Sequence, residues 1–104
     1  MTPVAITATD GHALGGALYG DPAQARAALL IAPAMGVPQR YYAEFAGWMA
    51  EQGYAVLTFD YRGMGDSRPA AHARSLRGFE ADIRTWAERD AAAALAHLAG
   101  LFGP

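Results

Sequence analysis

The stretch YAVLTFDYRGMGDSRP, Tyr54–Pro69, decides the fold. Its first six residues, Tyr54–Phe59, form a short apolar run rich in aromatic and β-branched residues, which is typical of a strand buried on both faces. The rest is charged and glycine-rich, and it contains Ser67, so we predict a tightly shaped loop. Open α/β sheets bind ligands where such a strand ends in a loop. We therefore expect the functional edge of the molecule at Asp60 and beyond.

An antiparallel hairpin is predicted at the start of the chain. Asp10-Gly11 lies between two strand-like runs, Val4–Thr9 and His12–Tyr19, and Asp-Gly in this position favours a tight hairpin turn. We expect both strands at a sheet edge. Glycine weakens a strand and often marks a bulge, so a bulge is expected at the glycine pair 15–16.

A parallel strand and a helix are predicted next. Leu29–Ala32 is the most apolar short run of the chain and predicts a central strand. Gln39–Gln52 predicts a helix that ends at Gly53, because large apolar side chains recur there at helical spacing. These side chains are Tyr41, Phe45, Trp48 and Met49. We expect this stripe to pack on the sheet; the alternative is that it lines a ligand pocket.

A second helix is predicted from Gly78 to about Leu98, with Gly100 as its end. Its apolar stripe consists of Ile83, Trp86, Ala87, Ala94 and Leu98. Asp90 falls in the middle of that stripe, and a buried carboxylate is costly unless it is paired. We predict a buried ion pair with Arg62, just past the buried strand; the alternative is a solvated Asp90 at the rim.

These elements together predict an α/β fold. A hairpin followed by strand, helix, strand and helix indicates a parallel core with at least one helix on each face. At 104 residues the chain is expected to form one domain at most.

The composition argues against several functions. The chain has no cysteine, which excludes disulfides and thiolate metal sites. Its net charge of -2, with arginines scattered among acids, gives no electrostatic basis for binding nucleic acid or anionic lipid. No signal peptide is visible, and no apolar run approaches the ~20 residues of a membrane span. We therefore expect a soluble, cytoplasmic protein of undetermined oligomeric state.

Two segments resemble enzymes of the α/β-hydrolase fold. Phe59–Ser67 resembles their D-x-R-G-x-G-x-S segment after the fourth strand, and Leu29–Gly36 resembles their third strand and the oxyanion loop after it. The likeness extends over roughly Val4 to Leu98. It is to the serine-aminopeptidase-like and monoacylglycerol-lipase-like branch, including its uncharacterised esterase-type members. The resemblance implies an incomplete hydrolase sheet and a serine hydrolase that acts on ester or amide bonds.

The resemblance also assigns one half of an oxyanion hole. Acyl transfer creates an oxyanion that preorganised backbone N–H groups stabilise. In the resembled family one donor follows a His-Gly pair, and that pair reads Pro33-Ala34 here, so the donor is the backbone N–H of Met35. The residues expected to have structural roles near the site are Gly36, Asp60, Arg62, Gly63, Gly65, Ser67 and Asp90.

The catalytic triad is expected outside these 104 residues. Ser67 and Ser75 lie in no G-x-S-x-G elbow, and Ser67 is expected to order its loop through bonds to backbone. No spacing links His12, His72 or His97 to a serine or to a metal site, and we predict no cofactor and no metal. In α/β-hydrolases the triad follows the region matched here. We therefore expect a partial domain, truncated before the nucleophile strand and inactive alone.

Three other interpretations compete with this one. Gly65-Asp66-Ser67 superficially resembles a Gly-Asp-Ser hydrolase block, but that family needs an asparagine and the chain has none. Gly63-Met64-Gly65 suggests a dinucleotide loop, but Arg68 holds the third glycine position. A non-catalytic α/β-hydrolase-like module, binding a small acyl ligand or a partner chain, stays open as the alternative. On the hydrolase interpretation, the partner of the full-length protein is a small ester or amide substrate.

Overall fold

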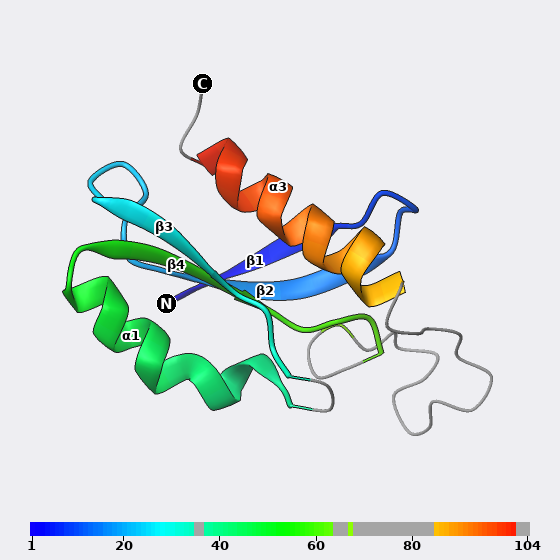
Figure 1. The fold of residues 1–104 in the computed structure, drawn as a ribbon, viewed down its shortest axis with the longest axis horizontal. Coiled ribbons are helices and arrows are strands. Elements are labelled where there is room, and N and C mark those ends of the chain that lie inside the picture. Colours follow the sequence, from blue (N-terminus) through cyan, green and yellow to red (C-terminus); the bar gives the residue numbers. More distant parts are fainter. Residues whose placement is uncertain (35–36, 64–66, 68–84, 102–104) are drawn as a thin grey trace.

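The computed structural model of the chain describes residues 1–34, 37–63, 67 and 85–101, without the side chain of residue 86. Figure 1 shows the fold. Its elements are β1 (Thr2–Thr7), β2 (Ala13–Tyr19), β3 (Ala27–Ile31), the 3₁₀-helix η1 (Gln39–Tyr42), α1 (Ala43–Glu51), β4 (Tyr54–Phe59), the π-helix η4 (Trp86–Ala91) and α3 (Ala92–Leu101).

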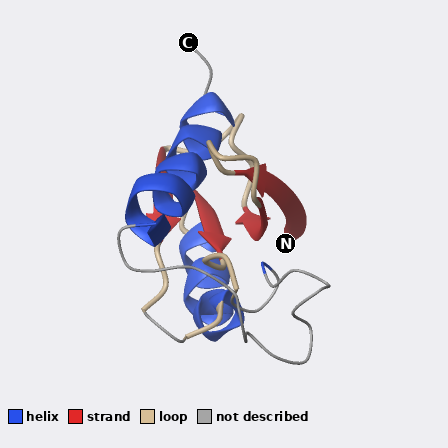
Figure 2. Ribbon diagram, turned by 90° about the vertical axis from the view of Figure 1, so that its right-hand side faces the viewer, coloured by secondary structure: helices blue, strands red, loops and turns tan. Residues whose placement is uncertain are grey.

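The four strands form one mixed sheet between two helices. The strand order is β1-β2-β4-β3, with β1–β2 and β2–β4 antiparallel and β3–β4 parallel. Helices α1 and α3 cover opposite faces of this sheet, as Figures 1 and 2 show from two directions. The predicted α/β fold, with a hairpin first and a helix on each face, is confirmed.

Strand β4 lies inside the sheet and is buried on both faces, as predicted. Val56, Leu57 and Phe59 are all fully buried. Strand β3 was predicted to be a central parallel strand; it pairs in parallel with β4, and within the described sheet it lies at the edge. Strand β2 occupies the other side of β4, with Leu18 opposite Leu57. Only β1 of the hairpin is therefore an edge strand.

The predicted Asp-Gly hairpin is present, but the predicted bulge is not. Gly11 has a φ of 85°, the left-handed conformation that its turn requires. The β1–β2 register runs without interruption through Gly15 and Gly16. Gly16 instead allows β2 and β4 to lie close together, because a Cβ there would lie 2.9 Å from the carbonyl oxygen of Thr58 on β4.

The main hydrophobic core lies between the sheet and α3. It consists of Ile6, Ala8, Leu14, Leu57, Phe59, Ala93, Ala94 and Leu98. Ala94 and Leu98 belong to the predicted stripe and are buried, whereas Ala87 is exposed, contrary to prediction. Ala87 lies in the π-helix, whose wider turn breaks the 3.6-residue phase on which the prediction depended. Ile83 and the predicted helix start at Gly78 lie outside the described residues, and α3 continues past Gly100.

The aromatic stripe of α1 does not pack on the sheet, and that prediction is wrong. Tyr41, Phe45 and Trp48 are 76%, 51% and 55% exposed, whereas Ala46 is fully buried. A small residue lets the helix lie close to the sheet and turns the bulky side chains outward. The predicted helix is also not one α-helix, since Gln39–Tyr42 forms a 3₁₀ turn whose tighter winding changes the helical phase of α1. Its predicted end is confirmed, because Gly53 lies just beyond α1 with a φ of 94°.

Candidate active-site edge

The carboxyl ends of β3 and β4 meet at one edge of the sheet, and a buried carboxylate joins the segments that come after them. Asp60, directly after β4, is 1% exposed. Its Oδ1 accepts the backbone N–H of Gln39 at 2.7 Å, and its Oδ2 accepts the side-chain amide of Gln39 at 3.1 Å. The hydroxyl of Thr58 donates to Gln39 Oε1 at 2.8 Å. Asp60 therefore fixes the residue at which the β3 loop ends and η1 begins.

Ser67 holds the β4 loop against the hairpin, in the structural role predicted for it. Its Oγ accepts the backbone N–H of Gly15 at 2.8 Å and donates to the carbonyl oxygen of Asp60. The backbone N–H of Gly63, which has a φ of 82°, donates to the Ser67 carbonyl at 3.3 Å. Ser67 is 3% exposed, so its hydroxyl is occupied and buried. These contacts suit a structural residue and not an attacking nucleophile.

The predicted Arg62–Asp90 ion pair is present and buried. Asp90 is fully buried, and its Oδ1 accepts Nε and a terminal nitrogen of Arg62 at 2.9 and 2.7 Å. Its Oδ2 accepts the backbone N–H of Arg62 at 2.8 Å. The carboxylate thereby holds both the side chain and the main chain of Arg62. This ties the loop after β4 to the helix that covers the sheet.

A second carboxylate, which the sequence analysis did not assign to the site, completes this cluster. Asp10 in the β1–β2 turn accepts the two terminal nitrogens of Arg62 at 2.7 and 2.9 Å. Arg89 lies farther away, with its Nε 3.9 Å from Asp10 Oδ2. One guanidinium thus joins the hairpin turn, the β4 loop and the helix. We call Asp10, Arg62 and Asp90 the arginine clamp.

The electrostatics of the clamp indicate a permanent structural charge. Hydrogen bonds from Arg62 hold the pKa of Asp10 well below its usual range. The hydrogen bonds to Asp10 and then to Asp90 raise the pKa of Arg62 further above its already high value. Burial, followed by the charges of Asp90 and Tyr42, raises the pKa of Tyr61. Arg62 keeps its proton throughout, so it is suited to holding the loop and not to moving protons.

Both backbone groups of Ala34, the last described residue before position 35, are hydrogen-bonded. The N–H of Ala34 donates to the hydroxyl of Tyr42 at 3.0 Å, and the carbonyl of Ala34 accepts the N–H of Val37 at 3.0 Å. The assigned donor Met35 and its neighbour Gly36 lie outside the described residues. Gly65, Ser75 and His72 lie outside them too.

Four residues of this edge were missed by the sequence analysis: Asp10, Gln39, Tyr42 and Thr58. Asp10 was explained by its hairpin turn alone, and a turn residue gives no sign of a distant partner. Gln39 was explained by helical periodicity. The available signal was the position of Gln39 directly after Pro38, where a polar side chain can anchor the start of a helix.

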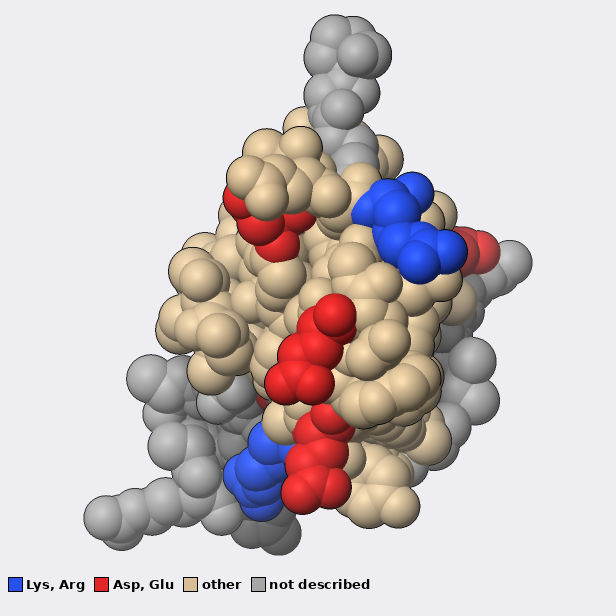
Figure 3. All heavy atoms as spheres, turned by 90° about the vertical axis from the view of Figure 1, so that its left-hand side faces the viewer, with Lys and Arg blue, Asp and Glu red and all other residues tan. Residues whose placement is uncertain are grey.

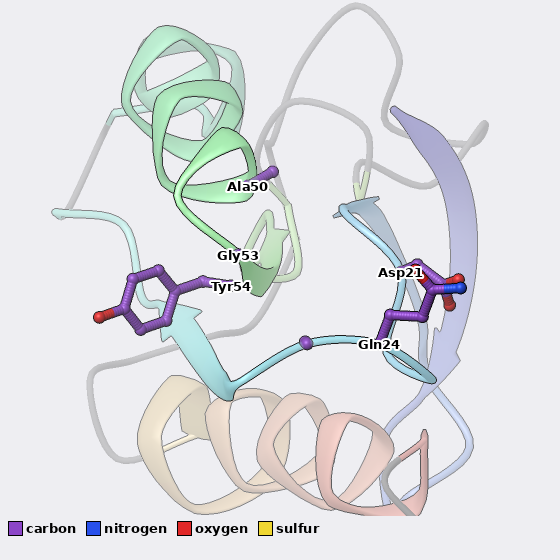
Figure 4. A pocket seen from close by; sticks show the side chains of 6 residues that line it. Asp21, Gln24, Ala50, Gly53 and Tyr54 are labelled. Carbon is purple, nitrogen blue, oxygen red and sulfur yellow. The ribbon is translucent and has the colours of Figure 1, made fainter.

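An open pocket of about 230 Å³ lies elsewhere, at the amino end of β4 (Figure 4). It is lined by Asp21, Gln24, Ala25, Ala50, Gly53 and Tyr54. Arg26 lies nearby, with its guanidinium 5.3 Å from the centre of the Tyr54 ring. None of the loop residues after β3 or β4 lines this pocket. The aromatic stripe of α1 does not line it either, so this pocket gives no support to the ligand-pocket alternative for that stripe.

Charged side chains form no broad single-sign patch on the face that Figure 3 shows, where acidic and basic groups lie among uncharged atoms. Within the described ranges, no three His, Asp or Glu side chains lie close enough together to hold a metal ion. A search of the same ranges finds no helix with the length and hydropathy needed to cross a bilayer.

Comparisons with known proteins identify the family and the fold of the chain. Residues 11–98 match the family described as serine aminopeptidase, S33. No curated protein sequence matches the chain. Among solved structures, the fold is similar to that of DcsB, determined in complex with its substrate analogue, with a TM-score of 0.74 and 21% sequence identity. The alignment covers 95% of this chain and 31% of the DcsB chain, so these residues correspond to part of that protein's length. The chain belongs to the serine aminopeptidase family and has a partial α/β-hydrolase fold.

Proposed function

We propose that these residues supply the amino-terminal scaffold and half of the oxyanion hole of a serine hydrolase that acts on ester or amide bonds. The family match and the α/β-hydrolase fold support this class of reaction. The half-site is the loop after β3, with the backbone N–H of Met35 as the donor. DcsB, which has a similar fold, was determined in complex with its substrate analogue.

The observation that carries the proposal is the anchoring of this loop at the carboxyl edge of β3 and β4. An oxyanion hole works because its N–H groups are held in place before the reaction begins. Both backbone groups of Ala34 are bonded, and Gln39 at the far end of the loop is fixed to the buried Asp60. The buried carboxylate of Asp60 is satisfied by its hydrogen bonds to Gln39, so the end of the loop is held in place before any ligand binds.

The nucleophile and its base are proposed to come from a part of the hydrolase beyond these residues. Ser67 cannot take this role, because it is buried and its hydroxyl bonds Gly15 and Asp60. In the complete enzyme a serine attacks the carbonyl carbon, a histidine accepts its proton, and the Met35 N–H binds the developing oxyanion. We therefore propose that residues 1–104 alone have no hydrolase activity.

The first test compares the isolated 104-residue chain with the full native protein that carries it. The reading frame and the intact mass of the native protein define the second sample. We expect a fluorophosphonate probe to label the native protein at a serine outside these residues, and not to label the isolated chain. Hydrolysis of p-nitrophenyl esters should show the same pattern. A native protein of 104 residues that takes no label would contradict the proposal and favour the non-catalytic binding module.

The second test addresses the backbone donor directly. Met35→Pro removes the N–H, whereas the matched control Met35→Leu keeps it. Loss of one oxyanion donor is expected to lower kcat by about 10²–10³-fold, and the control should retain most of the activity. Thermal unfolding of both variants separates a catalytic loss from a folding loss. A folded proline variant with unchanged kcat would exclude Met35 as the donor.

A further inference from the structure

Three large aromatic side chains lie exposed on the outer side of η1 and α1. Tyr41, Phe45 and Trp48 are each more than half exposed, and they recur at the spacing of one helix face. The opposite side of α1 packs on β2 and β4, where Ala46 is fully buried (Figure 1). We call the three exposed side chains the outer aromatic face. Aromatic residues are enriched in protein interfaces and dominate their energetics, so this face is a candidate docking surface.

Part of this face is held in place before any partner binds. Tyr41 packs edge to face on Tyr42, with ring centres 5.3 Å apart. The hydroxyl of Tyr42 accepts the N–H of Ala34 at 3.0 Å, so the ring against which Tyr41 packs is itself anchored. Aromatic side chains have few rotatable bonds and lose little conformational entropy on binding. Contact with this face therefore carries a low entropic cost.

The size of the outer aromatic face suits a weak interface. A large aromatic side chain buries about 150–250 Å², so the exposed parts of these three amount to roughly 300–450 Å². A standard stable interface buries about 800 Å² per partner, and transient complexes bury less. Neighbouring side chains add some contact area, but the total stays near the lower end of this range. The area favours a complex that forms and dissociates readily.

The charges at the two ends of this segment favour a second copy of the chain in antiparallel orientation. Arg40 and Glu51 are exposed at opposite ends, and among the described residues neither forms an ion pair. Antiparallel pairing about Phe45 brings the end that carries Arg40 to the end that carries the partner's Glu51. The same centre, to within one residue, brings Tyr41 near the partner's Trp48. Two-fold symmetry then makes each of these contacts twice.

The remaining charges near the face argue against an anionic lipid surface as its occupant. Glu44 and Glu51 both lie exposed on α1, and the net charge of the chain is -2, so an anionic bilayer would repel this surface. In the antiparallel pair, Glu44 lies close to its own symmetry mate, and the repulsion between the two carboxylates weakens the dimer.

We propose that the outer aromatic face is a homodimer interface, in which η1 and α1 of one copy pack antiparallel on the same segment of a second copy. The aromatic side chains supply the affinity, and the Arg40–Glu51 pairs set the orientation. This inference does not depend on the proposed hydrolase activity, because none of these side chains is assigned to the oxyanion half-site.

Sedimentation velocity of the full native protein over a concentration series measures the dimer. We expect a reversible monomer–dimer equilibrium with a dissociation constant above about 1 µM, as befits a small interface. Trp48→Ala should raise this constant by about 30-fold or more, because a central aromatic anchor is lost from both copies. Leu95→Ala is the matched control, since Leu95 is 57% exposed but lies on α3, and it should leave the constant unchanged.

Charge reversal tests the antiparallel pairing itself. Arg40→Glu places like charges opposite each other at both ends and should raise the dissociation constant by about tenfold. Combining Arg40→Glu with Glu51→Arg restores opposite charges, so the constant should return to within about threefold of the parent value. A general disturbance of the helix would not be repaired by the second substitution. Circular dichroism checks that each variant is folded.

Several results would overturn the proposal. A native protein that stays monomeric at every concentration would do so, as would a dimer that Trp48→Ala leaves unchanged. Failure of the double charge reversal to recover the affinity lost in Arg40→Glu would refute the antiparallel arrangement. A monomer that binds phosphatidylcholine vesicles, and loses this binding in Trp48→Ala, would assign the face to a membrane surface instead.

Discussion

Asp90→Ala should destabilise the chain strongly, because it removes the fully buried partner of the arginine clamp. Three hydrogen bonds from Arg62 end on this carboxylate, one from the main chain and two from the guanidinium. The Arg62 side chain is only 7% exposed, so water cannot readily replace the lost partner. Removing one member of a buried pair typically costs about 3–5 kcal/mol. Asp10 still faces Arg62 in this variant, so we expect a loss near the lower value, about 3 kcal/mol.

Urea unfolding followed by circular dichroism measures this loss. Small proteins have m-values of about 1–3 kcal/mol/M in urea, so a loss of about 3 kcal/mol lowers the unfolding midpoint by about 1 M or more. Glu44→Ala on the exposed side of α1 removes a carboxylate from a helix without a buried partner. Glu44 lies in the first turn of α1, where a carboxylate favours the helix, so this control should cost less than about 1 kcal/mol.

A double substitution tests the physical reason for the loss. If the cost comes from an uncompensated buried charge, Arg62→Met with Asp90→Leu should be less destabilising than the sum of the two single changes. A loss below about 1 kcal/mol in Asp90→Ala would refute the reasoning about the clamp. Additive single and double substitutions would refute the assignment of the loss to charge burial.

Four further predictions concern the fold, and each is measured as a change in the free energy of unfolding. Trp48→Ala should cost about 1–2 kcal/mol because about half of its side chain is exposed, less than Leu57→Ala, which should cost about 2–5 kcal/mol. Gly16→Ala should destabilise by about 1–3 kcal/mol because its Cβ would meet β4. Gly47→Ala, in open space on α1, should stabilise by about 0.5–1 kcal/mol. The pKa of Asp10 is lowered in the folded chain, so its ionised carboxylate stabilises the fold at pH values above 3.8, the ordinary pKa of this group. This stabilisation is lost as the pH falls through the folded-state pKa. The free energy of unfolding should therefore fall less steeply with decreasing pH in Asp10→Asn than in the parent chain. An unchanged pH dependence would contradict this assignment.

The sequence was sufficient to predict the features that depend on local pattern and on charge burial. Tyr54–Phe59 is apolar on both faces, so its burial could be inferred from composition. Asp90 stood out because a carboxylate on an apolar helix face needs a partner, and Arg62 was close enough in the expected topology. Both inferences depend on burial energies that hold in any fold: apolar side chains favour burial, and an unpaired carboxylate opposes it.

The errors have different origins: two arise from the packing of elements that are remote in sequence, and one arises from a local irregularity in a helix. The exposure of Phe45 and Trp48 depends on how closely α1 approaches the sheet, and helical periodicity carries no information about which face approaches. The phase error at Ala87 came from a π-turn, which no residue pattern announces. Asp10 was missed because its partner lies 52 residues away along the chain.

The order of the strands has a consequence for synthesis on the ribosome. Strand β4 is the last of the four to be made, yet β2 and β3 both pair with it, as Gly16 with Phe59 and Leu30 with Leu57. At roughly 5–20 residues per second, the inner edge of the hairpin waits a few seconds for its neighbour. Unpaired strand edges invite pairing with other chains during such a delay. The nascent chain is thus most vulnerable to aggregation before β4 emerges, and shielding by a chaperone would matter most in that interval.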